Sequence, residues 1–191
     1  MRQDEASRWM DFTATQTIAA DACAFDWRAR AGPLGLVHVR DALSGNTGSL
    51  GVKALGIVPI AKVPESPALT RGELLRYLAE IPWVPDAIFH NAALRWNELT
   101  SDRITVSAGA GGAAATIEFT LNGDGLIESA FATDRPRWMG NAAVPTPWRG
   151  HFGDYRLHGG KLLPFGGHVA WVLHGVEMRC WEGRLTSWAT I

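Results

Sequence analysis

The sequence predicts a mainly β (α+β) protein with one packed helix, and three patterns indicate this fold class. Apolar and polar residues alternate over short runs, as in FDWRAR (25–30), TIEFTL (116–121) and HVAWVL (168–173), which is typical of strands with one buried face. Turn signals separate these runs, and one stretch has helical periodicity. We therefore expect about nine or ten strands, joined mainly as hairpins into an antiparallel sheet.

Glycine-containing pairs supply the expected turns, because glycine and asparagine accept the positive φ angles of tight hairpins. The predicted turns are Gly45-Asn46, Asn122-Gly123-Asp124-Gly125, Gly159-Gly160 and Gly166-Gly167. The glycine-rich run SAGAGGAAA (107–115) lies between two strand-like runs and lacks the pattern of a phosphate loop. It predicts a wide hairpin turn.

The predicted helix covers about residues 71–81. Thr70 and Glu73 have the spacing of a capping box, in which each side chain bonds an amide at the helix start. Prolines 82 and 85 end the helix. Its apolar residues recur at helical spacing and form one stripe, namely Leu74, Leu75, Leu78 and Ile81. A sheet with one apolar face needs a cover, so we expect a strongly curved sheet or open half-barrel with this helix packed against it, as a single domain over residues 1–191.

Composition and charge exclude several classes of protein. The 191 residues are 47% hydrophobic and 19% charged, which is typical of a globular protein. The net charge is −1 and the lysines and arginines form no run, so we expect no nucleic-acid partner. The first residues lack the apolar core of a signal peptide, and no stretch is apolar enough for a membrane-spanning helix. We expect a soluble, cytoplasmic protein.

The sequence gives no sign of a metal or cofactor. Two cysteines, Cys23 and Cys180, stand at unrelated spacing and are interpreted as small buried apolar residues rather than a disulfide. There is no CxxC or HExxH motif, and the six histidines are scattered. We therefore predict neither a metal site nor a cofactor.

Tryptophan is the unusual component, with nine residues in the chain. Each indole buries a large area, so the tryptophans fit core filling. They equally fit the aromatic walls of a pocket for an apolar ligand. Both interpretations remain open from the sequence.

The segment TPWRGHFGDYR (146–156) concentrates polar groups among aromatic ones. On a regular strand, Trp148, Phe152 and Asp154 share one face with Gly150 and Arg156, whereas His151 and Tyr155 share the other. A His–Asp dyad is therefore not expected without a bulge at Gly153. Asp154 is either a structural partner of Arg156 or a buried acid that binds or protonates a ligand.

Five blocks carry a family resemblance: RGELLRYLAEIPWVPDAI, LRWNEL, IEFTLNGDGLI, PWRGHFGDYRLHGGKLLPFGGHVAWVLHG and CWEGRL. From about Trp9 to Ile191 the chain resembles a bacterial family of uncharacterised proteins, the domain-of-unknown-function group numbered 6544 or 6920. The positions that match its pattern are Gly72, Glu73, Trp83, Pro85, Trp96, Trp148, Gly150, Asp154, Tyr155 and Trp171.

The resemblance implies an open β-barrel, related in shape to periplasmic lipoprotein carriers, that encloses an apolar cavity with a curved antiparallel sheet and a helix. Family members carry additional residues before the segment that matches WMDFTATQTI, sometimes with a membrane anchor. We accordingly expect that a first strand or helix is absent here and that the cavity is more open. The resemblance brings no established reaction.

The predicted function is binding of a hydrophobic small molecule or lipid-like ligand. The expected walls are Trp27, Trp96, Trp148, Phe152 and Trp171. Asp154, Tyr155 and Arg156 are expected to orient the polar end of the ligand. The patterns do not indicate an oligomeric state.

Two other functions remain open. One is a cofactor-free acid/base enzyme (a hydratase, isomerase or hydrolase) in the same cavity, with Asp154 or His151 as acid or base and Tyr155 as hydrogen-bond donor. The other is a structural or partner-binding domain, which predicts a sizeable exposed apolar patch.

Overall fold

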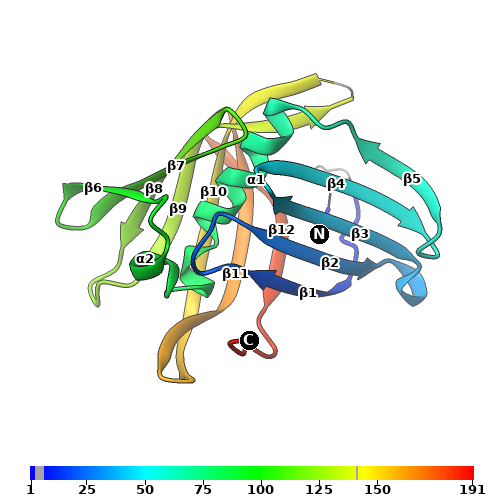
Figure 1. The fold of residues 1–191 in the computed structure, drawn as a ribbon. Helices are drawn as coiled ribbons and strands as arrows, with labels where there is room; N and C mark the ends of the chain where they lie inside the picture. Colours follow the sequence, from blue (N-terminus) through cyan, green and yellow to red (C-terminus); the bar gives the residue numbers. More distant parts are fainter. Residues whose placement is uncertain (3–6, 141) are drawn as a thin grey trace.

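The computed structural model of the chain describes residues 1–2, 7–140 and 142–191. The chain forms two antiparallel sheets, which do not close into a barrel (Figure 1). The first sheet has five strands in sequence order: β1 (Phe12–Ile18), β2 (Phe25–Ala31), β3 (Val37–Ser44), β4 (Thr47–Ala54) and β5 (Val58–Val63). A short 3₁₀ helix, η1 (Pro33–Gly35), joins β2 to β3.

The second sheet has seven strands, again in sequence order from one edge to the other. They are β6 (Arg95–Thr100), β7 (Arg103–Ala110), β8 (Ala113–Leu121), β9 (Ile127–Met139), β10 (Ala142–His158), β11 (Lys161–Leu173) and β12 (Val176–Arg184). Every strand pairs with its neighbour in the chain, as expected when hairpins connect antiparallel strands.

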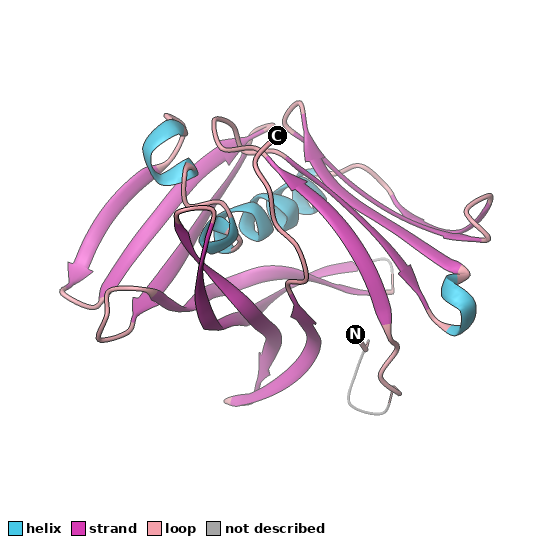
Figure 2. Ribbon diagram, turned by 90° about the horizontal axis from the view of Figure 1, so that it is seen from below, coloured by secondary structure: helices cyan, strands magenta, loops and turns pink. Residues whose placement is uncertain are grey.

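Helix α1 (Pro67–Ala79) lies between the two sheets (Figures 1 and 2). It contacts β3 and β4 of the five-stranded sheet and β7, β8 and β9 of the seven-stranded sheet. The predicted apolar stripe is buried, since Leu74, Leu75, Leu78 and Ile81 are fully inaccessible to solvent. Burial extends round the helix to Tyr77, because two sheets cover it from different sides. The expectation of a single sheet with one covering helix is therefore corrected to two sheets with the helix between them.

The helix begins earlier than predicted, and its N-cap is Ser66 rather than Thr70. The Ser66 hydroxyl accepts a hydrogen bond from the backbone N–H of Leu69 (3.2 Å), and Pro67 occupies the first turn, where its missing N–H is not needed. Thr70 instead lies within the helix, where its hydroxyl accepts a hydrogen bond from the N–H of Gly48 in β4 (3.1 Å). The chain after α1 forms a 3₁₀ helix, η2 (Ile81–Trp83), and a four-residue helix, α2 (Ala87–His90).

The described residues form twelve strands, more than the nine or ten expected. The edge strands β5 and β6 have mostly exposed side chains, so hydrophobic alternation does not mark them. The predicted turns at Gly45-Asn46 and Gly159-Gly160 are confirmed, with φ of 54° and 66° in the first. The predicted turn at Gly166-Gly167 is wrong, because both residues lie within β11.

The structure bears on the two cysteines and on membrane-spanning helices. Cys23 and Cys180 are both free and partly buried, in agreement with the expectation of no disulfide. Within the described part of the chain, the helices fall short of the length and apolar character needed to cross a membrane.

Candidate functional site

A continuous layer of aromatic rings lies between the two sheets. Phe12 of β1 contacts Trp27 of β2 and Trp181 of β12, with ring centroids 6.1 and 5.8 Å apart. Trp83 of η2 contacts Trp181 at 6.5 Å and Phe152 of β10 at 5.2 Å. We call this set, together with Trp148 and Trp171, which are paired across β10 and β11, the inter-sheet aromatic layer. It joins one sheet to the other through side chains alone.

Three glycines provide flat surfaces on which indoles of this layer lie. A Cβ atom added to Gly167 would stand 3.1 Å from the Trp83 ring, and one added to Gly150 would stand 3.2 Å from the Trp148 ring. A Cβ at Gly183 would stand 2.5 Å from the Trp181 ring. Gly167 is therefore present for close packing of a ring against a strand, which explains why the prediction of a turn there failed.

Arginine side chains cover several rings of the layer. The Arg76 guanidinium, from α1, lies 4.9 Å from the ring of Phe25 and 5.0 Å from that of Trp27. On the seven-stranded sheet, Arg135 lies 4.7 Å from the Trp148 ring and Arg137 lies 5.7 Å from the Trp171 ring. Such cation–π contacts place positive charge on the face of each indole.

These arginines differ in their acidic partners. Arg76 forms ion pairs with Asp41 of β3 and with Glu80, the latter at 2.8 Å. Arg135 and Arg137 are half-buried, and neither has an ion pair with any carboxylate among residues 1–2, 7–140 and 142–191. Burial lowers the pKa of Arg135, against the opposing influence of Glu73. A half-buried cation without a partner is costly, because it has lost water without gaining an anion.

A pair of acidic side chains lies beside these arginines. Glu73 of α1 and Asp41 of β3 are both buried, and each has one carboxylate oxygen without a hydrogen-bond partner in the structure. Burial raises the pKa of Glu73 well above its ordinary value, and the neighbouring charge and hydrogen bond of Asp41 raise it further. The fold therefore favours the protonated form of Glu73, because two buried carboxylates in contact resist simultaneous ionisation.

Five of the six residues predicted to bind a ligand lie in or against one hydrophobic core cluster. Trp27, Trp148, Phe152 and Trp171 all belong to the inter-sheet aromatic layer and pack in one cluster. Trp96, on the edge strand β6, packs against the same cluster but stacks on Phe119, with ring centroids 6.2 Å apart, rather than on a ring of the aromatic layer. Arg156 is exposed and pairs with Asp154 at 2.6 Å.

The three predicted catalytic residues have three separate sets of partners. Asp154 is exposed, and its hydrogen bonds from Arg156 lower the pKa of its carboxyl group. Its φ of 55° interrupts the regular strand, so the alternation assumed from the sequence ends at this residue. The Tyr155 hydroxyl donates to the carbonyl of Ile127 (2.6 Å), and burial raises its pKa. His151 instead contacts Glu177 and His168.

His151, His168 and Glu177 are the described residues that could hold a metal ion. The two histidine rings stack with centroids 4.5 Å apart, and His151 Nε2 lies 3.0 Å from a carboxylate oxygen of Glu177. The donor atoms lie within 4.8 Å of one another, whereas those of tetrahedral zinc stand about 3.4 Å apart. Arg149 also pairs with Glu177 at 3.2 Å. Metal binding would thus need the cluster to contract and Arg149 to move away.

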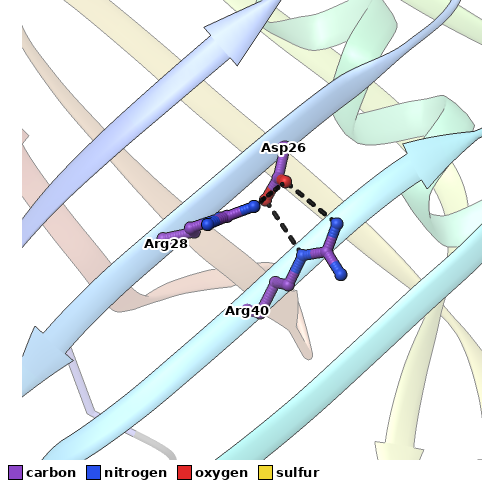
Figure 3. Close-up of polar contacts among 3 residues, drawn as sticks. All are labelled: Asp26, Arg28 and Arg40. Carbon is purple, nitrogen blue, oxygen red and sulfur yellow. Dashed lines mark hydrogen bonds and ion pairs between the residues drawn. The ribbon is translucent and has the colours of Figure 1, made fainter. Parts of the chain in front are cut away.

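The outer face of the five-stranded sheet carries an open groove of about 900 Å³. Its basic side chains are Arg28, Arg30, His38, Arg40, Lys53 and Lys62. Asp26 forms ion pairs with Arg28 (2.8 Å) and Arg40 (2.9 Å), on the side of the sheet away from α1 (Figure 3). None of the aromatic residues predicted to form a cavity wall lines this groove.

Sequence reasoning missed most of the polar residues beside the aromatic layer. From the sequence, Glu73 was interpreted only as a capping residue, and no role was assigned to Arg135. The signals that could have found them are the alternation of Arg135 and Arg137 in one strand and an acidic residue at a buried helical position. The rings of Trp83 and Trp181 could have been matched to Gly167 and Gly183 only with the strand register in hand.

These features define a class of protein: two antiparallel sheets with a helix between them and an inter-sheet layer of aromatic and arginine side chains. The chain matches the model of DUF6920, a family of unknown function, over residues 1–189, and it belongs to that family. This confirms one of the two family numbers expected from the sequence. No curated protein and no solved structure matches the chain.

Proposed function

We propose that this protein binds an apolar small molecule with a negatively charged group, held between its two sheets. The observation that carries the proposal is the pair Arg135 and Arg137, two half-buried guanidinium groups without a carboxylate partner among the described residues. Buried charges in proteins are normally paired. An anionic group of a ligand would supply the missing partner, and guanidinium binds carboxylate and phosphate in a bidentate manner.

The apolar part of the ligand would pack on the inter-sheet aromatic layer. Phe12, Trp83, Phe152, Trp171 and Trp181 are only partly buried, so water reaches faces of these rings. Binding sites for small molecules combine such apolar walls with a few polar groups that set orientation. The proposal keeps the hydrophobic or lipid-like ligand expected from the sequence, and replaces Asp154 and Arg156 by Arg135 and Arg137 as its polar contacts.

Two fluorescent probes that differ in charge test this proposal. 8-Anilinonaphthalene-1-sulfonate has an apolar body with an anionic group, whereas N-phenyl-1-naphthylamine has a similar body without charge. Arg135→Gln is expected to weaken the sulfonate probe at least about tenfold, equivalent to about 1.4 kcal/mol. Affinity for the uncharged probe should change little. The control is Arg103→Gln, since Arg103 is exposed on β7.

The outcomes separate the proposal from nonspecific binding. A sulfonate affinity that is equal in wild type, Arg135→Gln and Arg103→Gln would show that Arg135 does not meet the anion. Failure of both probes to bind at micromolar concentration would refute a ligand site between the sheets.

A second candidate, a cofactor-free acid/base enzyme, is favoured by Glu73. A carboxyl group whose pKa is raised by burial can act as a general acid, and Glu73 lies close to Arg135. Wild-type protein would be assayed on apolar esters, epoxides and enones. Glu73→Gln is then expected to lower turnover by about a hundredfold or more, with unchanged affinity for the sulfonate probe. No turnover of these three classes by wild type would reject this candidate.

A further inference from the structure

Two neighbouring loops at one end of the five-stranded sheet expose large apolar side chains. One loop contains η1 and joins β2 to β3, and the other joins β4 to β5. They lie side by side, since the backbone N–H of Leu55 donates to the carbonyl of Leu36 (2.8 Å). We define the apolar tip as Leu34, Leu36, Leu55, Ile57 and Val58, which are 93%, 43%, 61%, 79% and 56% exposed.

Two leucines of the apolar tip also have an unfavourable backbone. Leu34 has φ of 57° and Leu55 has φ of 53°, in the left-handed region where a Cβ atom is strained. Glycine or asparagine would relieve this strain, and a polar residue would remove the exposed apolar surface. In the isolated molecule, leucine at these two positions costs both backbone strain and exposed apolar surface. This indicates that the tip contacts an apolar partner surface.

Positive charge surrounds the apolar tip. Arg30 of β2, His38 of β3 and Lys53 of β4 are partners in the strand register and lie next to the two loops. Arg30 and Lys53 have no acidic partner in the described part of the chain. Further along the groove, Arg28 and Arg40 share the single carboxylate of Asp26 (Figure 3). Arg30 and Lys53 therefore place two positive charges without an ion-pair partner among the described residues at the end of the sheet that carries the tip.

We propose that this end of the five-stranded sheet docks on an anionic membrane surface. The apolar tip would enter the boundary between headgroups and acyl chains, while Arg30 and Lys53 meet the phosphates and carboxylates of anionic lipids. A protein partner could bury the apolar side chains, but the unpaired cations around them complement a negatively charged surface. Met10, which is 40% exposed and lies beside Gly32, extends the apolar surface at this end. The docking surface is separate from the inter-sheet aromatic layer and does not depend on a ligand there.

Sedimentation with lipid vesicles tests the docking. Wild-type protein is expected to bind vesicles with about 30% phosphatidylserine and not vesicles of phosphatidylcholine alone, with binding reduced by high salt. The double variant Leu34→Asn/Leu55→Asn should lose at least about tenfold in affinity. Asparagine tolerates positive φ, so this variant is expected to fold, and an unchanged or higher Tm will verify it. Phe89→Asn is the matched control, because Phe89 is 84% exposed on α2.

The charge requirement is tested with two variants of equal net charge. Arg30→Gln/Lys53→Gln should lose binding to the anionic vesicles, while Arg95→Gln/Arg103→Gln, on the other sheet, should keep it. The proposal is overturned if the wild-type protein does not bind anionic vesicles. It is equally overturned if each control variant loses as much vesicle affinity as the variant it is matched to. It is also overturned if sedimentation shows a wild-type dimer that Leu34→Asn/Leu55→Asn converts to monomer, because the tip would then be a self-interface.

Discussion

The carboxyl groups of Glu73 and Asp41 meet in the interior between helix α1 and strand β3, where Glu73 is 5% exposed and Asp41 is 8% exposed. Burial, followed by the charge of Asp41, raises the pKa of Glu73. The folded protein therefore keeps a proton that the unfolded chain releases above the ordinary glutamate pKa of 4.5. The fold has a proton-binding group in its interior, close to Arg135.

This relationship predicts a pH-dependent stability. A group whose pKa is raised on folding contributes its full stability below the unfolded pKa, and this contribution is lost as pH rises toward the folded pKa. The free energy of unfolding in urea should fall as pH rises from the ordinary glutamate pKa of 4.5 toward the raised pKa of the folded state, and Glu73→Gln should flatten this slope. Glu98→Gln, at an exposed position on β6, should keep the wild-type slope. Equal slopes in all three proteins would contradict a raised pKa for Glu73.

The start of helix α1 predicts different costs for two hydroxyl deletions. Ser66→Ala removes the N-cap and should destabilise the protein by about 1 kcal/mol. Thr70→Val leaves the buried N–H of Gly48 without an acceptor, at a cost of about 1–3 kcal/mol. Thr70→Ser retains the hydroxyl and serves as control. Urea unfolding would oppose this assignment if Ser66→Ala had no effect and Thr70→Ser were as harmful as Thr70→Val.

The contact between Gly167 and Trp83 predicts a strong effect of a single methyl group. Gly167→Ala would place Cβ 3.1 Å from the indole and 3.3 Å from the carbonyl oxygen of His151, so the ring or the strand must shift. We expect a loss of about 1–3 kcal/mol and a change in tryptophan fluorescence. Gly153→Ala, on β10, meets no atom within 4 Å and should leave the spectrum unchanged. A silent Gly167→Ala would show that the ring does not depend on this surface.

The ligand proposal predicts that substituting a tryptophan of the inter-sheet aromatic layer weakens probe binding, whereas substituting one outside the layer does not. Trp171→Ala removes a wall of the inter-sheet aromatic layer and should weaken both naphthalene probes by about tenfold, or about 1.4 kcal/mol. Trp96→Phe, on β6 beyond the layer, should leave both affinities close to wild type. Fluorescence titration of the two variants measures this directly, and equal losses would indicate a global effect on the fold instead of a local site.

Local patterns were sufficient for many elements. Alternation over residues 25–30 predicted the buried face of β2, and Phe25, Trp27 and Ala29 are buried there. The glycine turns at 45–46 and 159–160 were predicted because positive φ is a local property of the backbone. The predicted number of strands was too low, since strands that bury little surface, such as the edge strands β5 and β6, carry little hydrophobic pattern.

The candidate site shows the limit of the same reasoning. Trp27, Trp148, Phe152 and Trp171 were predicted because large aromatic side chains on alternating strands must be buried somewhere. Asp154 was expected beside them because regular alternation was assumed to continue, whereas its positive φ ends the alternation. A single residue in the left-handed region changes the direction of its side chain, and the neighbouring sequence gives no sign of this positive φ.

By itself, the sequence determined the antiparallel β class, the helix and a set of aromatic residues on the buried faces of strands. These follow from periodicity and turn chemistry, which depend on residues close together in the chain. Only the tertiary structure decided that two sheets enclose the helix, that Glu73 meets Asp41, and that Arg135 and Arg137 lie over indoles without an ion pair to any described carboxylate. Those relationships join residues far apart in the chain, and their energies depend on burial and strand register, which exist only after the sheets have come together.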